Sequence, residues 1–130
     1  MGHPSSGKKN RRSYPRLSCT VPVEVLDQSS KAPFFATVAD ISMGGCFVQT
    51  QALVVVATQC SIKFTTDLGE LQVNGVVARN NPGTGIAIRF DDTSLQDRER
   101  ITLLLRFVES LANHARSGQR YLSSLARTSP

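Results

Sequence analysis

Three arginines lie within six residues near the start of the chain, in the stretch RRSYPR from Arg11 to Arg16. A guanidinium is planar and always charged, and it can donate paired hydrogen bonds to a phosphate or to the edge of a guanine. Such a segment suits a nucleic-acid arm or a clamp for a compact phosphorylated ligand. A solubilising tail or a tag would also carry charges of this kind, so the rest of the sequence has to decide.

The positive charge of the chain is concentrated in this segment. The formal net charge is +5, from 15 basic and 10 acidic residues. Five of the basic residues precede the first acidic residue, Glu24, which leaves ten basic and ten acidic residues in the remainder. A neutral body argues against broad affinity for nucleic acids or membranes. The five cations of the segment are Lys8, Lys9, Arg11, Arg12 and Arg16.

A second unusual stretch is DISMGG, from Asp40 to Gly45. Asp40 and Ser42 are two residues apart in an extended segment, so their side chains are expected on the same face. Gly44 and Gly45 then allow a tight turn and a backbone that a ligand can approach closely. Taken alone, the stretch is more typical of a polar hairpin turn in which Asp and Ser bond their own backbone.

The sequence offers little to an enzyme, and we predict no catalytic residue. It contains no nucleophile elbow, no phosphate-binding G-x-x-x-x-G-K motif and no metal triad. No base lies near Ser42, and His114 is placed for a surface or capping role near the end of a predicted helix. Asp91 and Asp92 open that helix, where they complement its dipole.

The three cysteines, Cys19, Cys46 and Cys60, show no C-x-x-C spacing. The N-terminus lacks the apolar stretch of a secretory signal, so we interpret them as reduced thiols of a cytoplasmic protein. No cofactor and no metal are expected. No apolar run is long enough to span a bilayer, which predicts no membrane insertion.

From Ser18 onward the sequence alternates between apolar and polar residues, as half-buried strands do. About six such runs follow one another with short turns and no intervening helix, which predicts an antiparallel sheet closed into a barrel or a sandwich. Gly75, inside the fifth run, predicts a bulge or a bend. The phenylalanines of the runs are expected mostly in the core; they are Phe34, Phe35, Phe47, Phe64 and Phe90.

The periodicity changes at Asp91, and residues 91–115 are predicted to form a helix that covers the barrel. Thr93 or Ser94 can cap it, with Asp97 placed as in a capping box. Charged residues at 98, 99, 106 and 109 face water. Residues 1–10 are expected to be a flexible segment, 11–115 one domain, and 116–130 a tail or an extension of the helix. The predicted apolar stripe consists of Leu95, Ile101, Leu104, Leu105, Val108 and Leu111.

The two polar stretches together resemble a known pattern. R-x-x-x-R at Arg12 and Arg16 precedes the first strand, and D-x-S-x-x-G, from Asp40 to Gly45, ends the second. With a final strand followed by a helix, the chain resembles the PilZ domain, the bacterial receptor module for the second messenger cyclic di-GMP, over residues 11–112. The resemblance implies a six-stranded antiparallel β-barrel with a C-terminal α-helix.

The resemblance also implies a ligand site for cyclic di-GMP. The arginines would bind its phosphates or guanines, Asp40 would accept hydrogen bonds from guanine, and Ser42 would donate to phosphate or bond the base. Gly45 would leave room for the ligand, beside Gly44. Arg79 would lie beside a guanine, unless it is an ordinary surface arginine. Arg11, just before the motif, implies that an intercalated pair of ligands binds.

The expected function is therefore a cytoplasmic cyclic di-GMP receptor whose arginine arm orders on ligand binding and signals to an unknown partner protein. No nucleic acid is expected as a partner. The alternative is a small β-barrel that binds RNA or single-stranded DNA through its basic arm. A third interpretation is a degenerate family member that binds only a protein. The sequence does not name the process that is regulated.

Overall fold

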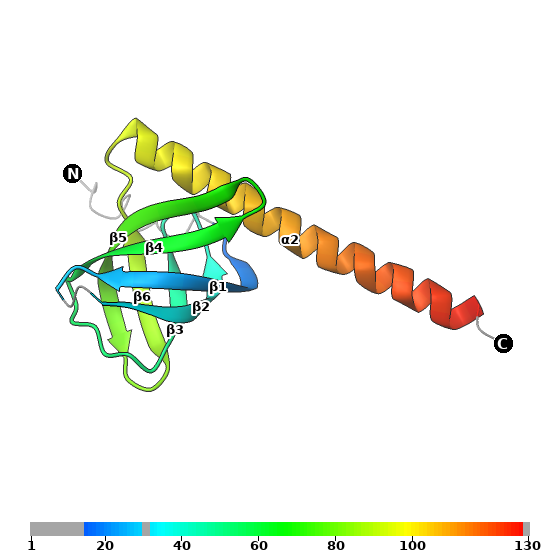
Figure 1. Ribbon diagram of the computed structural model, residues 1–130, viewed down its shortest axis with the longest axis horizontal. Helices are drawn as coiled ribbons and strands as arrows, with labels where there is room; N and C mark the ends of the chain where they lie inside the picture. The colour runs from blue at the N-terminus through cyan, green and yellow to red at the C-terminus, as the bar shows by residue number, and fades with distance from the viewer. Residues whose placement is uncertain (1–14, 30–31, 129–130) are drawn as a thin grey trace, which may run out of the picture.

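The structure is a computed structural model that describes residues 15–29 and 32–128, with side chains as far as residue 113. Arg11 and Arg12 of the arm, the segment 1–10 and the side chain of His114 lie outside the described residues. The described chain forms one small barrel, from which a long helix extends (Figure 1).

Six strands close into a barrel in the order β1-β2-β3-β6-β5-β4, and every neighbouring pair is antiparallel. The pairing of β1 with β4 completes the ring, so the barrel, not the sandwich, is the observed fold. Closure leaves no strand edge exposed among these six strands. The strands are β1 (Leu17–Asp27), β2 (Pro33–Ile41), β3 (Gly45–Gln49), β4 (Gln59–Thr66), β5 (Gly69–Asn81) and β6 (Gly85–Phe90).

Alternate residues of each strand fill the barrel with valine, isoleucine and phenylalanine. Phe64 and Phe90 are buried as predicted, and Phe34 packs against the core. The prediction for Phe35 is wrong, since its side chain is 83% exposed. Consecutive residues of a strand point to opposite faces, so Phe34 and Phe35 cannot both face the interior. Phe47 is only half-buried.

Three strands carry one extra residue relative to a neighbour. These bulges lie between Ser18 and Val21 in β1, at Ala39 in β2 and at Ala78 in β5. The bulge predicted at Gly75 is absent, because the register is continuous there. Glycine is needed at that position for another reason: a Cβ would lie 2.6 Å from the carbonyl oxygen of Arg89. The two strands approach each other too closely for a side chain.

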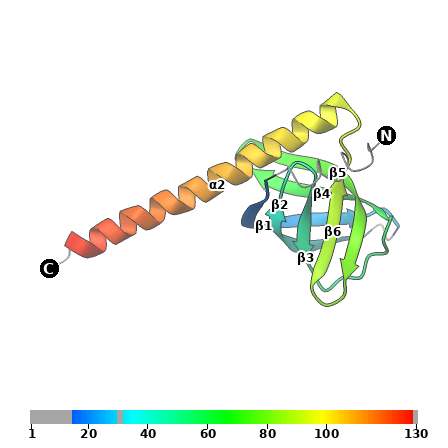
Figure 2. The same ribbon diagram turned by 180° about the vertical axis from the view of Figure 1, so that it is seen from behind.

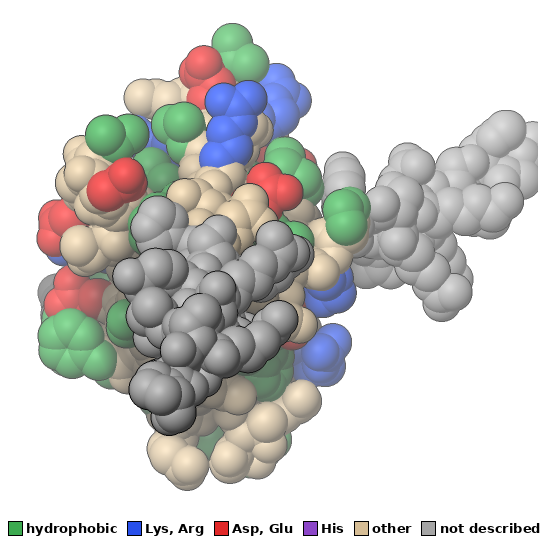
Figure 3. Space-filling view, turned by 90° about the vertical axis from the view of Figure 1, so that its right-hand side faces the viewer, with side chains coloured by type: hydrophobic (Ala, Val, Ile, Leu, Met, Phe, Trp, Pro, Cys, Tyr) green, Lys and Arg blue, Asp and Glu red, His purple; other side chains and the backbone are tan. Residues whose placement is uncertain are grey.

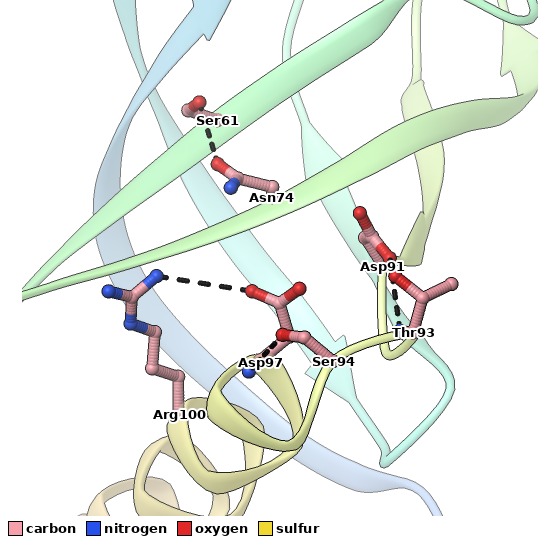
Figure 4. Close-up of polar contacts among 7 residues, drawn as sticks. All are labelled: Ser61, Asn74, Asp91, Thr93, Ser94, Asp97 and Arg100. Atoms are coloured by element: carbon pink, nitrogen blue, oxygen red, sulfur yellow. Dashed lines mark hydrogen bonds and ion pairs between the residues drawn. The ribbon is translucent and has the colours of Figure 1, made fainter.

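Helix α2 (Leu95–Thr128) begins after a capped turn. The Asp97 amide donates to the Ser94 hydroxyl at 3.0 Å, so Ser94 is the cap (Figure 4). Just before it, the Asp91 carboxylate accepts hydrogen bonds from the Thr93 hydroxyl at 2.8 Å and the Thr93 amide at 3.1 Å. These bonds lower the pKa of Asp91 and hold the turn that leads from β6 into the helix.

The middle of the predicted stripe packs on the barrel. Ile101, Leu104 and Val108 are buried, and α2 contacts β5 and β1. Leu95 and Leu111, at the two ends of the stripe, are exposed, which corrects the prediction. The helix is straight and the barrel is small, so α2 meets the barrel over only a few turns and then extends past it (Figures 1 and 2). No helix of the described residues is long and apolar enough to cross a membrane.

Neighbouring leucines on α2 provide a test of this packing. Leu104 is fully buried, whereas the side chain of Leu103 is 51% exposed. We expect Leu104→Ala to lower the free energy of unfolding by about 2–5 kcal/mol, because it leaves a cavity between α2 and the barrel. Leu103→Ala should lower it by less than about 1 kcal/mol. Denaturant unfolding of both variants measures the difference, and equal losses would contradict the observed packing.

Candidate functional site

One ion pair joins the two polar motifs. The Arg16 Nη2 atom lies 2.5 Å from the Asp40 Oδ1 atom, with the arginine side chain 59% and the aspartate side chain 33% exposed. Arg16 stands directly before β1, and Asp40 lies near the end of β2, opposite Ser18. Because β1 and β2 pair with each other, residues 24 positions apart in sequence meet at this point.

The bulge at Ala39 directs Asp40 toward Arg16. Val38 is buried and pairs with Val48, so strict alternation would point residue 40 into the core as well. The extra residue shifts the register, and Asp40 pairs instead with the half-buried Phe47. Bulges re-aim side chains in this way. A carboxylate that would be costly to bury therefore reaches the outer surface.

The bulge at Ala78 does the same for Arg79. Val77 is buried and pairs with Ile88, whereas Arg79 is exposed and pairs with Ala87. Without the extra residue, an arginine two positions after Val77 would face the interior. Both bulges thus place a charged side chain on the outside of the barrel.

The turn after β2 is held by its own hydrogen bonds. The Ser42 amide donates to the Gly45 carbonyl at 2.8 Å, and the Gly44 amide donates to the Ser42 hydroxyl at 3.2 Å. The Gly44 carbonyl in turn accepts from the Phe90 amide at 2.9 Å, which ties the turn to the end of β6. Ser42 therefore stabilises the turn, as expected of a polar hairpin turn in which the serine bonds its own backbone. Asp40 instead pairs with Arg16 of the arm.

The packing of β3 against β6 explains why position 45 is a glycine. A Cβ at this position would lie 2.1 Å from the carbonyl oxygen of Ile88 in the paired strand. The described glycines with positive φ are Gly69 and Gly83, so Gly45 is not required for a left-handed backbone. Its role is to let β3 approach β6. The prediction that it also leaves room for a ligand stays a prediction.

A cavity of about 490 Å³ lies beside this turn. Five of the predicted site residues line it: Arg16, Ser42, Gly44, Gly45 and Arg79. Asp40 is not part of the wall, but it holds Arg16 there through the ion pair. The volume is in the range of small-molecule sites. Three arginines against one aspartate among the lining residues make the cavity suitable for an anionic ligand.

The third arginine, Arg89, and the aspartate, Asp92, were not predicted as site residues. Arg89 pairs with Gly45, so no side chain stands between it and the cavity on that strand. A signal for Arg89 existed in the sequence, since the alternation that buries Ile88 and Phe90 places residue 89 outside. Asp92 follows the strand, where no periodicity could locate it.

The cysteines are unsuited to nucleophilic chemistry. Cys46, on the cavity wall, is fully buried, and this burial raises the pKa of its thiol far above the ordinary value. Burial also raises the pKa of Cys60, to about 11, and that of Cys19. A thiol of raised pKa is a poor nucleophile at neutral pH. Among the residues that the structure describes, no three potential ligands gather to hold a metal ion.

Comparisons with known proteins agree with this geometry. The family model "PilZ domain" matches residues 10–108, and no curated protein sequence matches the chain. The PilZ domain of CeSA from a cellulose-synthesizing bacterium is 28% identical, with a TM-score of 0.62 over 75% of this chain and 98% of that chain.

Two further solved structures share the fold at lower identity. The PilZ domain of YcgR from Escherichia coli with c-di-GMP is 14% identical, with a TM-score of 0.66 over 85% of this chain and 98% of that one. The K. pneumonia MrkH–c-di-GMP complex is 18% identical, with a TM-score of 0.60 over 81% of this chain. The aligned region covers 55% of the length of that MrkH chain.

Two glycines of the β3–β6 pair test whether close packing of the strands, without any ligand, requires glycine at position 45. Gly85, at the other end of the β3–β6 pair, would place a Cβ 2.1 Å from the Val48 carbonyl oxygen, as Gly45 does with Ile88. We expect Gly45→Ala and Gly85→Ala each to lower the free energy of unfolding by about 1–3 kcal/mol through overpacking. Denaturant unfolding without any ligand is the measurement. An unchanged stability of Gly45→Ala would show that the close approach is not what requires this glycine.

Proposed function

The chain belongs to the PilZ family, and from this premise we propose that it is a receptor for cyclic di-GMP. PilZ domains are non-catalytic receptors, in agreement with the absence of catalytic motifs in the sequence. The observation that carries the proposal is the Arg16–Asp40 pair at the edge of an arginine-lined cavity. We place the receptor domain at residues 11–115.

The chemistry of the ligand matches the side chains around the cavity. Cyclic di-GMP carries two phosphodiester anions and two guanines. Arg16 has five N–H donors and uses one of them toward Asp40, so others remain for a phosphate or for the O6 and N7 atoms of guanine. The Asp40 carboxylate can accept from the N1–H and N2–H donors of guanine. Arg16 and Asp40 together could thus read both parts of the ligand.

The remaining wall of the cavity supports an anion. Arg79 and Arg89 add two positive charges from β5 and β6, and Asp92 removes one. The Ser42 hydroxyl accepts from the Gly44 amide and can donate its own proton to a phosphate oxygen. YcgR and MrkH, which share the fold, were solved with c-di-GMP.

We further propose that the arm containing Arg11 and Arg12 orders over the ligand. The arm is basic and flanked by Gly and Ser, so it cannot bury a core of its own. Phosphate would compensate its charge, and the covered cavity would present a changed surface. A partner protein that distinguishes this surface from the free one would receive the signal.

A nucleic-acid-binding barrel is the weaker alternative. Such barrels stack bases on aromatic side chains of a strand face. Here Phe64 and Phe90 are buried, and Phe35 is the strongly exposed phenylalanine of the described strands. On the face drawn in Figure 3, basic and acidic side chains are interspersed over the described surface. Only the arm favours this function.

The clamp is tested by calorimetry with cyclic di-GMP. We expect Arg16→Ala and Arg12→Ala each to weaken binding by at least about 1.5–3 kcal/mol, the range for hydrogen bonds to charged groups. Arg98→Ala is the matched control, because Arg98 is exposed on α2 and does not line the cavity. Unchanged affinity in both arm variants would remove the clamp. Equal affinity of the unmodified chain for GTP, GMP or single-stranded DNA would remove the receptor proposal.

The stoichiometry is tested at Arg11. A second ligand brings two more phosphate charges and further guanine faces to the same site, and an arginine can neutralise the charge and stack on a base. We expect two ligands per chain at saturation, and Arg11→Leu should lower the ratio toward one while keeping measurable affinity. A calorimetric ratio of one for the unmodified chain would contradict the intercalated pair and leave the receptor proposal intact.

A further inference from the structure

Helix α2 continues well beyond the barrel. Among the side chains that the structure describes on α2, Val108 is the last buried one, and none of residues 109–113 is buried. The helix nevertheless runs on to Thr128, and in both ribbon views it extends away from the strands (Figures 1 and 2). The 20 residues from Glu109 to Thr128 correspond to about 30 Å of helix at 1.5 Å per residue.

Such a segment needs a partner to be stable as a helix. Without tertiary contacts, the helicity of such a segment depends on its length and on the helix propensity of its residues. This segment contains Gly118, Asn113 and four serines, all of which have lower helix propensity than alanine. Helical stability in proteins comes mainly from packing of an apolar face. The question is therefore which surface covers the face of α2 beyond the barrel.

The sequence of α2 carries a heptad pattern from position 101 to position 125. Apolar or small residues recur at alternating intervals of three and four, the 3.5-residue period of a left-handed coiled coil. The first three positions are buried on the barrel, and the other five continue the same pattern past it. The eight positions are Ile101, Leu104, Val108, Leu111, Ala115, Gly118, Leu122 and Leu125.

The positions that flank this seam favour a second copy of the same chain. Beyond Val108 they carry no residue of fixed charge, so two identical helices can meet without like charges facing each other. The arginines at 116, 120 and 127 occupy other heptad positions. The uncharged flanking positions are Ala112, His114, Gln119, Tyr121 and Ala126.

A membrane surface fits this helix less well. Helices that lie in a bilayer interface present a broad face of bulky apolar residues. Here the middle of the seam is Ala115 and Gly118, which offer a lipid little apolar area but let two helix backbones approach closely. A narrow seam with small central residues is typical of helix pairing.

A groove on the barrel indicates the direction of the pairing. About 420 Å³ in volume, it lies where α2 leaves the barrel, and Val21, Phe35, Phe107 and Leu111 contribute to its walls. Phe35 is 83% and Leu111 43% exposed. In an antiparallel pair with position 111 opposite position 122, the last turns of one helix lie alongside the groove of the other chain. The same contact would cover the exposed leucine and phenylalanine.

We propose that the chain forms a homodimer through an antiparallel pair of α2 helices, in which the C-terminal turns of each helix cover the groove beside Phe107 and Leu111 of the other chain. The interface is self-complementary, as a two-fold symmetric dimer requires. The proposal is independent of the ligand, because the seam positions whose side chains are described, 101, 104, 108 and 111, do not line the cavity beside Gly45.

Sedimentation equilibrium of the full chain tests the dimer. We expect a mass of twice 14.1 kDa. The double variant Leu122→Arg with Leu125→Arg should raise the dimer dissociation constant at least about 100-fold, since it brings unpaired charges into the seam. The matched control, Ser123→Arg with Ser124→Arg, adds the same charges beside the seam and should leave the dimer intact. An unchanged midpoint of thermal unfolding for the barrel shows that each variant is folded.

Two results would overturn the dimer. One is an unmodified chain that is monomeric at all concentrations. The other is an unmodified chain that binds anionic phospholipid vesicles through Leu122 and Leu125 and is monomeric when no vesicles are present.

Cross-linking tests the direction, in a Cys19→Ser background that removes the half-buried thiol. A short bismaleimide should join Leu111→Cys in one chain to Leu122→Cys in another when the two variants are mixed. Cross-linking of Leu111→Cys with itself as the dominant product would overturn the antiparallel arrangement.

Discussion

The site depends on how closely β3 approaches β6. A glycine stands at each end of this strand pair, and a Cβ on either would lie 2.1 Å from a carbonyl oxygen of the opposite strand, that of Ile88 or Val48. This approach brings the Gly44 carbonyl to the Phe90 amide and so fixes the hairpin turn against the end of β6. The cavity beside the turn, with Arg89 on its wall, follows from that contact.

Bulges reconcile the closed barrel with the site. A barrel of this size needs apolar residues at its inward positions, and Val38 and Val77 meet that need two positions before the two charged residues. One extra residue after each of them turns Asp40 and Arg79 to the outside without interrupting the core. The same strands thus provide interior packing along most of their length and polar groups at the end where the cavity lies.

The sequence predicts much of this fold and part of the site, for identifiable physical reasons. Alternation identifies the strands, and the order of the two motifs identifies Arg16 and Asp40 as residues of one site. Their contact depends on strand register, which is set by bulges at Ala39 and Ala78, and alanine carries no signal for a bulge. The prediction for Phe35 is wrong for a simpler reason: its apolar neighbours favour the core, but alternation places only one of two adjacent strand residues inside. The extent of α2 past the barrel depends on barrel size, which no local pattern encodes.

The Arg16–Asp40 pair explains how the site can be organised and still open to a ligand. Both side chains are partly exposed, and exposed ion pairs contribute only about 0–1 kcal/mol to stability. The pair therefore holds Arg16 beside the cavity, and under the proposed function a ligand that bound there could keep or replace this contact at little energetic cost. Asp92, on the same cavity wall, lies two residues before Ser94, the cap of α2. Under the proposed function, a ligand in the cavity would lie beside the segment that starts the helix. If α2 joins two chains, that ligand would lie at the base of the element that joins them.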